Sequence, residues 1–113
     1  MTADKTGAPT TVSAADGKYT IAVDGKTVGY AAVADRDNQR VFYHTEVDDE
    51  FGGRGLASIL VREALEATRA DGKRVVPVCK MVAAVLKKHS EFDDIADPVT
   101  PEIARWADRL ANG

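Results

Sequence analysis

The sequence predicts one α/β domain whose mixed sheet starts with antiparallel hairpin strands and ends with a strand–helix–strand crossover. Apolar residues alternate over residues 18–23 and are followed by Asp24–Gly25, a pattern typical of a β-hairpin. From Leu56 the apolar period becomes helical, and a short apolar run, RVVPV, follows at residues 74–78. A helix between two such strands predicts a right-handed parallel crossover.

Length and composition narrow the class of protein. The chain has 113 residues, 44% hydrophobic and 29% charged, which suits one domain with one modest core. The net charge of −3 argues against a nucleic-acid binder and permits a cationic partner such as an amine. One cysteine, Cys79, and two histidines exclude a disulfide and a Cys/His zinc cluster, so we expect no metal.

No targeting or membrane signal is visible in the sequence. No apolar run approaches the ~20 residues that a membrane-spanning helix needs. The first residues lack the apolar centre of a signal peptide. The sequence therefore predicts a soluble protein of the reducing cytoplasm, with no membrane partner.

The chain divides into three segments. Residues 1–16 are polar, lack a periodic apolar pattern and are expected to form a flexible N-terminal tail. Residues 17–96 form the domain, with further strands expected at residues 27–33 and 40–47. Residues 97–113 are expected to form a C-terminal helix that packs on the domain.

Each predicted helix has an apolar stripe. The first ends at Asp71–Gly72, and the second lies within residues 79–92. The C-terminal helix starts with Thr100 as N-cap and Pro101 in the first turn. Its Trp106 is expected to pack on the core, with a dimer contact as the alternative, so we expect a monomer or a weak homodimer. The stripes comprise Leu56, Ile59, Leu60 and Ala64; Met81, Val82, Val85 and Leu86; and Ile103, Trp106, Ala107 and Leu110.

Three glycines surround one arginine where the third strand becomes the first helix. A helix N-terminus offers free backbone N–H groups and partial positive charge, and glycine lets the backbone approach an anion closely. The pattern lacks the Lys-Ser/Thr of a P-loop and the third glycine of a dinucleotide turn. A tight turn without a ligand is the alternative. The residues of this candidate anion site are Gly52, Gly53, Arg54, Gly55, Leu56 and Ala57.

The stretch TEVDDEFGGRGLASILVREAL resembles the acetyl-CoA pyrophosphate motif of the GNAT N-acetyltransferases, Gln/Arg-x-x-Gly-x-Gly/Ala. Gly55 and Ala57 match its two small residues, whereas Gly52 occupies the Gln/Arg position and departs from the motif. Together HTEV, FGGRGLA and VPVCKMVAAVLKKHSEF are similar to the short single-domain YjdJ-type subgroup of that family. The resemblance covers roughly residues 17–95.

The resemblance implies a GNAT-like fold that binds acetyl-CoA and acetylates an amine. The pyrophosphate would lie on the glycine turn, and Thr45 and Val47 would line the pantetheine arm through their backbone. Lys80 would meet a coenzyme phosphate or simply solubilise its helix. The thioester would lie near Cys79, which could protonate the leaving thiolate, carry the acetyl group, or be a small buried residue. Many family members use a tyrosine in the following helix, but Val85 occupies that place here.

His44 and Glu46 are the candidates for a general base. Residues two apart on a strand share a face, so this pair should lie on one face with Thr45 and Val47 on the other. An exposed polar edge is the alternative. At the level of function, the alternative to an N-acetyltransferase is a non-catalytic acyl-CoA-binding module, because only a turn separates the first two strands. A protein-interaction domain would rest on the C-terminal helix alone.

Overall fold

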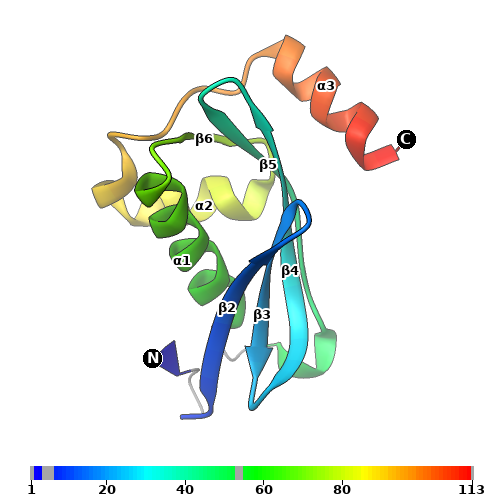
Figure 1. Cartoon of the computed structure of the whole chain (residues 1–113), viewed down its shortest axis with the longest axis vertical. Coiled ribbons are helices and arrows are strands. Elements are labelled where there is room, and N and C mark those ends of the chain that lie inside the picture. Colours follow the sequence, from blue (N-terminus) through cyan, green and yellow to red (C-terminus); the bar gives the residue numbers. More distant parts are fainter. Residues whose placement is uncertain (1, 4–6, 53–54, 113) are drawn as a thin grey trace.

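The computed structural model describes residues 2–3, 7–52 and 55–112 (Figure 1). Within these residues, six strands and three α-helices follow one another along the chain, with two short 3₁₀ turns. In chain order they are β1 (Thr2–Ala3), β2 (Pro9–Ala15), β3 (Lys18–Val23), β4 (Lys26–Arg36), β5 (Gln39–Val47), η1 (Asp49–Phe51), α1 (Leu56–Ala70), β6 (Arg74–Pro77), α2 (Lys80–Lys88), η2 (Ser90–Phe92) and α3 (Pro101–Asn112).

The strands form one mixed sheet in the order β1-β2-β3-β4-β5-β6. Every neighbouring pair is antiparallel except β5 and β6, which are parallel and joined through α1. Tight turns at Asp16–Gly17, Asp24–Gly25 and Asp37–Asn38 connect β2 to β5, and all three contain a residue with positive φ. The predicted mixed sheet with a strand–helix–strand crossover is confirmed.

The prediction of a flexible tail over residues 1–16 is wrong for residues 9–15. These residues form β2, which pairs with β3 from Thr10↔Val23 to Ala15↔Lys18. Thr10 is 3% exposed, and Val12 packs against the core. Only these two side chains mark the inward face, so the apolar alternation was too weak to recognise. The Asp16–Gly17 turn was the stronger signal of a further hairpin.

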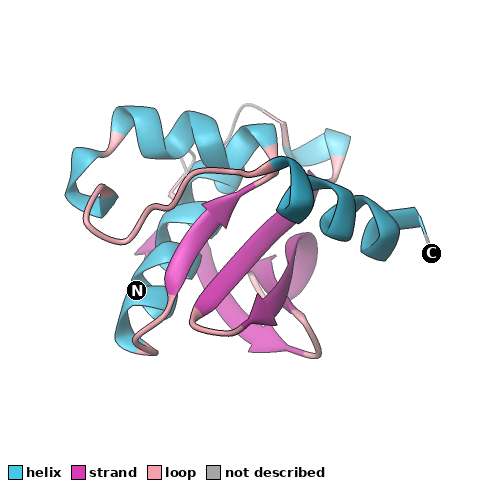
Figure 2. Ribbon diagram, turned by 90° about the horizontal axis from the view of Figure 1, so that it is seen from above, coloured by secondary structure: helices cyan, strands magenta, loops and turns pink. Residues whose placement is uncertain are grey.

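Helices lie on both faces of the sheet, α1 and α2 on one face and α3 on the other (Figure 1). On one face, α1 packs over β3, β4 and β5, and α2 packs on α1, β5 and β6, around a main core that includes Phe42, Leu60 and Val82. On the other face, α3 lies apart from them and packs on β5 and β6 through Ile103 and Ala107 (Figure 1 and Figure 2). We call the first face the covered face and the second the open face. Among the described helices, none is long and apolar enough to cross a membrane.

The start of α3 agrees with the sequence prediction. The Ile103 N–H donates to Thr100 Oγ1 at 3.2 Å, so Thr100 is the N-cap. Trp106 packs on the small cluster around Val41 and Val76, while the Arg36 guanidinium lies 5.4 Å from the centre of its ring. The stripe ends earlier than expected, because Leu110 is 43% exposed. Met81, expected on the apolar side of α2, is likewise 38% exposed.

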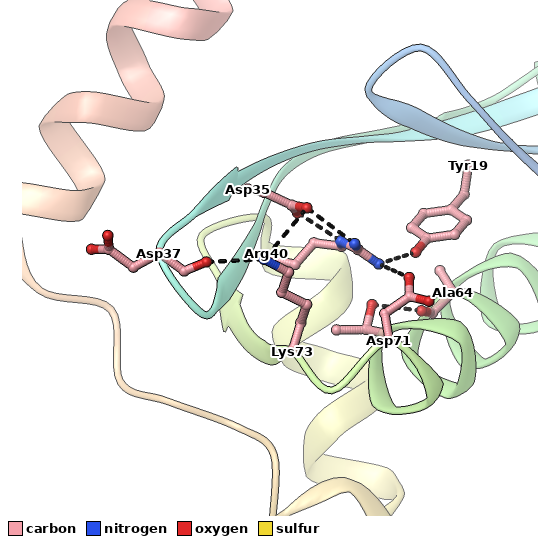
Figure 3. Close-up of polar contacts among 8 residues, drawn as sticks. Tyr19, Asp35, Asp37, Arg40, Ala64, Asp71 and Lys73 are labelled. Atoms are coloured by element: carbon pink, nitrogen blue, oxygen red, sulfur yellow. Dashed lines mark hydrogen bonds and ion pairs between the residues drawn. The ribbon is translucent and has the colours of Figure 1, made fainter.

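Arg40 of β5 forms a network of hydrogen bonds and ion pairs in the part of β5 that pairs with β6 (Figure 3). The Arg40 guanidinium donates to both carboxylate oxygens of Asp35 at 2.7 and 3.1 Å, to Asp71 at 2.8 Å and to the Tyr19 hydroxyl at 2.6 Å. Its side chain is only 11% exposed. These bonds join β3, β4, β5 and the end of α1.

The chain after η2 covers the outer side of β6. The Val75 N–H donates to the Ile95 carbonyl, and the Asp97 N–H donates to the Val75 carbonyl, both at 2.8 Å. Gln39 and Arg74 then donate to the Asp97 carboxylate at 2.9 and 2.7 Å. This short strand is therefore held from both sides, which fixes where the following Cys79 lies.

Candidate active site

The two parallel strands pair over only part of their length. The described ladder runs from Gln39↔Arg74 to Phe42↔Pro77, and one further bond joins the Cys79 N–H to the Phe42 carbonyl at 2.8 Å. Beyond this bond β5 continues to Val47, whereas the segment that follows β6 turns away into α2. The second half of β5 and the start of α2 therefore diverge, and we call the region between them the gap.

Cys79 lies at the closed end of this gap. It is the N-cap residue of α2, half-buried, and its thiol donates to the Thr45 hydroxyl across the gap, with Sγ and Oγ1 3.3 Å apart. Lys80 follows as the first residue of α2 and is exposed. The structure thus brings together two predicted site residues that are far apart in sequence, Thr45 and Cys79.

The glycine turn lies further along the same side of β5. Gly55 has a φ of 76°, which favours glycine, and it caps α1 at its N-terminus. Leu56 is 2% exposed and anchors the helix start in the core, and the first bond of the helix joins the Ile59 N–H to the Gly55 carbonyl. The amides of the first helical turn precede this ladder and point toward the turn.

A cavity of about 320 Å³ adjoins this turn. Its lining comes from β5, the turn and the first turn of α1, and the predicted Val47 is one of its walls. Gly53 and Arg54, which were predicted to bind the same anion, lie outside the described residues. The lining residues are Val47, Phe51, Gly52, Gly55, Leu56, Ala57 and Ser58.

The two residues predicted to act as a general base, His44 and Glu46, lie on the opposite, open face of β5. His44 Nε2 and Glu46 Oε1 are 3.6 Å apart, and the side chains are 50% and 65% exposed. Thr45 points the other way, toward Cys79. The predicted alternation along this strand is confirmed, and it also means that His44 and Glu46 do not contact the Cys79 thiol.

Tyr30 of β4 completes this open-face group. Its ring lies against the His44 imidazole with the ring centres 5.8 Å apart, and it pairs with Glu46 in the β4–β5 register. Burial raises the pKa of Tyr30 above its ordinary value, and the charge of the Glu46 carboxylate and its hydrogen bond with the hydroxyl raise it further. The hydroxyl therefore stays neutral and able to donate.

A β-bulge changes which side chains reach the open face. Val33 pairs with Phe42 and Ala32 pairs with His44, so Tyr43 is an extra residue on β5. As a result Tyr43 and His44 both point to the open face, where they line one hollow, although they are consecutive. A bulge of this kind re-aims side chains near a functional site.

The profile of the GCN5-related N-acetyl-transferases matches residues 18–95, which is more than half of the chain. The chain belongs to this family. The match includes β3 to β6, the glycine turn, Cys79 and α2, whereas α3 lies beyond it. Acetyl transfer is therefore the general chemistry that the family relationship supports.

One solved structure agrees with this fold, and a second is less similar. A GCN5-like protein from Staphylococcus aureus, determined by NMR, superposes with a TM-score of 0.62 at 20% identity, over 80% of this chain and 91% of that one. An aminoglycoside acetyltransferase from an uncultured soil metagenomic sample, solved with sisomicin, gives a TM-score of 0.44 at 12% identity, over 84% of this chain and 53% of that one. No curated protein matches the sequence.

Within this GCN5-related fold, the sequence-predicted candidates Thr45, Val47 and Cys79 lie on the covered face, whereas two aromatic residues of the open face were not among the candidates. Tyr30 was not recognised, although the strand alternation puts it on the same face as Ala32. Tyr43 could not be assigned correctly, because simple alternation places it with Thr45, and only the bulge moves it to the other side.

Proposed function

We propose that this protein transfers the acetyl group of acetyl-CoA to a primary amine by direct attack within a ternary complex. The observation that carries the proposal is the gap between β5 and α2, which has Cys79 at its closed end and a glycine-capped helix N-terminus beside its open end. In a GCN5-related fold, this arrangement suits an extended thioester whose phosphates lie at one end and whose reacting carbonyl lies at the other.

The covered face supplies the proposed coenzyme site. The amides and dipole of α1 favour a pyrophosphate in the cavity beside Gly52, Gly55 and Ala57. The backbone of Thr45 and Val47, which has no β6 partner in the described ladder, can pair with the amides of the pantetheine arm as an added strand would. Lys80 is exposed next to Cys79, at the end proposed for the thioester, so we assign it to solubilising α2 rather than to a coenzyme phosphate.

The reaction requires a neutral amine and a stabilised leaving group. The amine nitrogen attacks the thioester carbonyl carbon, the C–N bond forms, and the C–S bond breaks with its electron pair leaving on sulfur. The nitrogen loses a proton, and the thiolate gains one to become the CoA thiol. Holding the two reactants in one gap supplies much of the rate enhancement.

Three side chains are assigned to the proton transfers. Cys79 donates to Thr45 in the structure, and we assign its proton to the departing thiolate, which is a stronger acceptor than a hydroxyl. His44 and Glu46, 3.6 Å apart on the open face, accept the proton of the incoming amine directly or through water. A free thiol at this position suits the reducing cytoplasm, where we place the reaction.

Thermal melting with acetyl-CoA tests coenzyme binding. We expect a rise in Tm at millimolar acetyl-CoA, and no rise would refute both acetyl transfer and simple coenzyme binding. Gly55→Asp should abolish the rise by placing a carboxylate against the phosphates. Gly55→Asn is the matched control, since it has the same shape without the charge and asparagine tolerates positive φ.

Release of free CoA thiol across a panel of amines tests turnover. Thiol release that depends on both acetyl-CoA and an amine supports the transferase. A rise in Tm without thiol release from any amine would instead identify a non-catalytic acyl-CoA-binding module.

A further inference from the structure

The open face contains a hollow of about 500 Å³ between the sheet and the end of α3. We propose that this hollow binds the acceptor, a primary ammonium ion with a single charge and an apolar body. The proposal rests on the proposed function and adds the location and chemical class of its second substrate. The lining residues are Tyr30, Ala32, Tyr43, His44, Leu110 and Ala111.

The volume and walls suit a small organic molecule. Ligand sites of this kind enclose ~300–1,000 Å³ and are mainly apolar and aromatic with a few polar groups. Here β4 and β5 supply the aromatic walls, and α3 supplies Leu110 and Ala111. Leu110 is 43% exposed although it continues the apolar stripe of α3, and a ligand body in the hollow would cover it.

The aromatic walls favour a cation. An ammonium group is attracted to the face of a tyrosine ring within ~6 Å of the ring centre. The Tyr30 ring already has such a contact, because Lys18 Nζ lies 5.6 Å from its centre. Glu46, beside Tyr30 and His44, supplies the negative charge that a bound ammonium ion would neutralise.

The hollow lies across the sheet from the proposed thioester. On the open face, Tyr43 of β5 and Val78 after β6 lie where these two segments diverge, and both pack against the cluster of Val41, Val76, Ile103 and Ala107. On the covered face, Thr45 and Cys79 belong to the same two segments and contact each other. An amine in the hollow would therefore reach the thioester from the side opposite to the coenzyme, and it would pass His44 and Glu46, which can take its proton.

The charge of the walls limits the substrate class. The residues that line the hollow include no carboxylate, and Glu46 is the acidic neighbour of its Tyr30 and His44 walls. A polycation needs several such partners, whereas one ammonium group on an alkyl or arylalkyl body needs one. Such a group could belong to a free amine or to a lysine side chain, and the experiment separates these two sources.

Filling the hollow tests the proposal. Ala111 is exposed, so Ala111→Trp should fold normally while its indole occupies the hollow. We expect the KM for phenethylamine to rise about tenfold or more, equivalent to about 1.4 kcal/mol, with the KM for acetyl-CoA unchanged. Arg109→Trp, on the exposed side of α3, is the control and should change neither constant.

The Lys18 ammonium group lies over Tyr30 and should compete with the ammonium group of the substrate, so its removal tests the role of charge. Lys18→Met keeps the aliphatic stem but removes the ammonium group now over Tyr30, and should tighten phenethylamine binding about twofold to fivefold. Titration of CoA-loaded protein should show that 2-phenylethanol, which is neutral, binds more weakly than phenethylamine. Comparison with a lysine-containing peptide shows whether a free amine or a protein side chain is preferred.

The outcomes separate the two proposals. Loss of acetyl-CoA binding in the unmodified protein would overturn the proposed function itself. Turnover of phenethylamine that Ala111→Trp leaves unchanged would overturn only the acceptor site, as would failure of phenethylamine to bind the CoA-loaded protein.

Discussion

Cys79 is held at both its backbone and its side chain. Its N–H donates to the Phe42 carbonyl and its thiol donates to the Thr45 hydroxyl, so two residues of β5 hold one residue of the segment that follows β6. A side chain held in this way has little freedom to lose when a ligand binds. The position suits proton transfer at a defined atom better than a mobile surface cysteine would.

Replacing Cys79 tests its assigned role. Cys79→Ala should lower kcat by about 10²-fold or more, the usual loss when a general acid is removed, because the leaving thiolate would lose its proton donor. The rise in Tm with acetyl-CoA should remain, since the coenzyme phosphates bind elsewhere. Unchanged turnover would remove Cys79 from the mechanism.

Intact mass distinguishes proton donation from a covalent route. Direct attack predicts no stable acetyl adduct after treatment with acetyl-CoA alone. An adduct of one acetyl group that disappears in Cys79→Ala would show that the thiol carries the acetyl group instead.

At the scale of elements, Gly29 of β4 faces β5 at a point where there is no room for a side chain. A Cβ atom at this position would lie 2.8 Å from the Glu46 carbonyl oxygen and 2.9 Å from Val47 Cγ2. Both neighbours belong to the part of β5 that borders the gap. A glycine is therefore required for close packing where β5 has left its parallel partner.

Gly29→Ala should destabilise the fold and disturb the site together. The added methyl group has to push β5 outward, which costs about 1–3 kcal/mol of unfolding free energy. Urea unfolding measures that loss, and acetyl-CoA titration should show weaker binding because Val47 moves. Thr27→Ala, at an exposed position on the same strand, is the control, with an expected change within about 0.5 kcal/mol. Equal stability of the two variants would contradict the close contact.

The elements that the sequence predicted correctly are those with a strong local signal. Asp24–Gly25 defines a hairpin by itself, and α1 combines an apolar stripe with a glycine cap. β2 was missed because only Thr10 and Val12 point inward from it. The Tyr43 bulge was missed because it depends on how two strands pair, which no single strand encodes.

Part of the candidate site could be predicted from the sequence and part could not. The glycine turn and Cys79 lie within motifs that resemble a family, so their neighbourhood could be expected. The hollow under α3 could not be expected, because it forms between a strand bulge and a helix beyond the family match.

Across the whole molecule, the Arg40 network closes the end of the sheet opposite to the gap. Hydrogen bonds from Arg40 hold the pKa of Asp35 below its usual range, with its burial opposing them and the charges of Arg40 and Lys73 adding to them. A carboxyl whose pKa is lower in the folded state stabilises the fold above its unfolded pKa. That stabilisation is lost as the pH falls through the folded pKa.

Arg40→Met should therefore matter most at neutral pH. We expect a loss of about 1–3 kcal/mol in unfolding free energy at pH 7, because Asp35, Asp71 and Tyr19 lose one shared donor. The difference from the unmodified protein should shrink well below about pH 4, where Asp35 is protonated in both folded and unfolded chains. Arg40→Lys, which keeps the charge without the fork, should be intermediate at pH 7. A difference independent of pH would show that the ion pair with Asp35 contributes nothing, and that packing and the bond to Tyr19 account for the loss.

The order of the strands has a consequence for how the chain reaches its folded state. β2 to β5 pair with their sequence neighbours through tight turns, so these contacts close short loops and can form early. The β5–β6 pair joins residues about 35 positions apart, and has to wait for α1 to be made. Because Thr45 and Cys79 meet only across that last pair, ligand binding during refolding would report the final step rather than the early collapse.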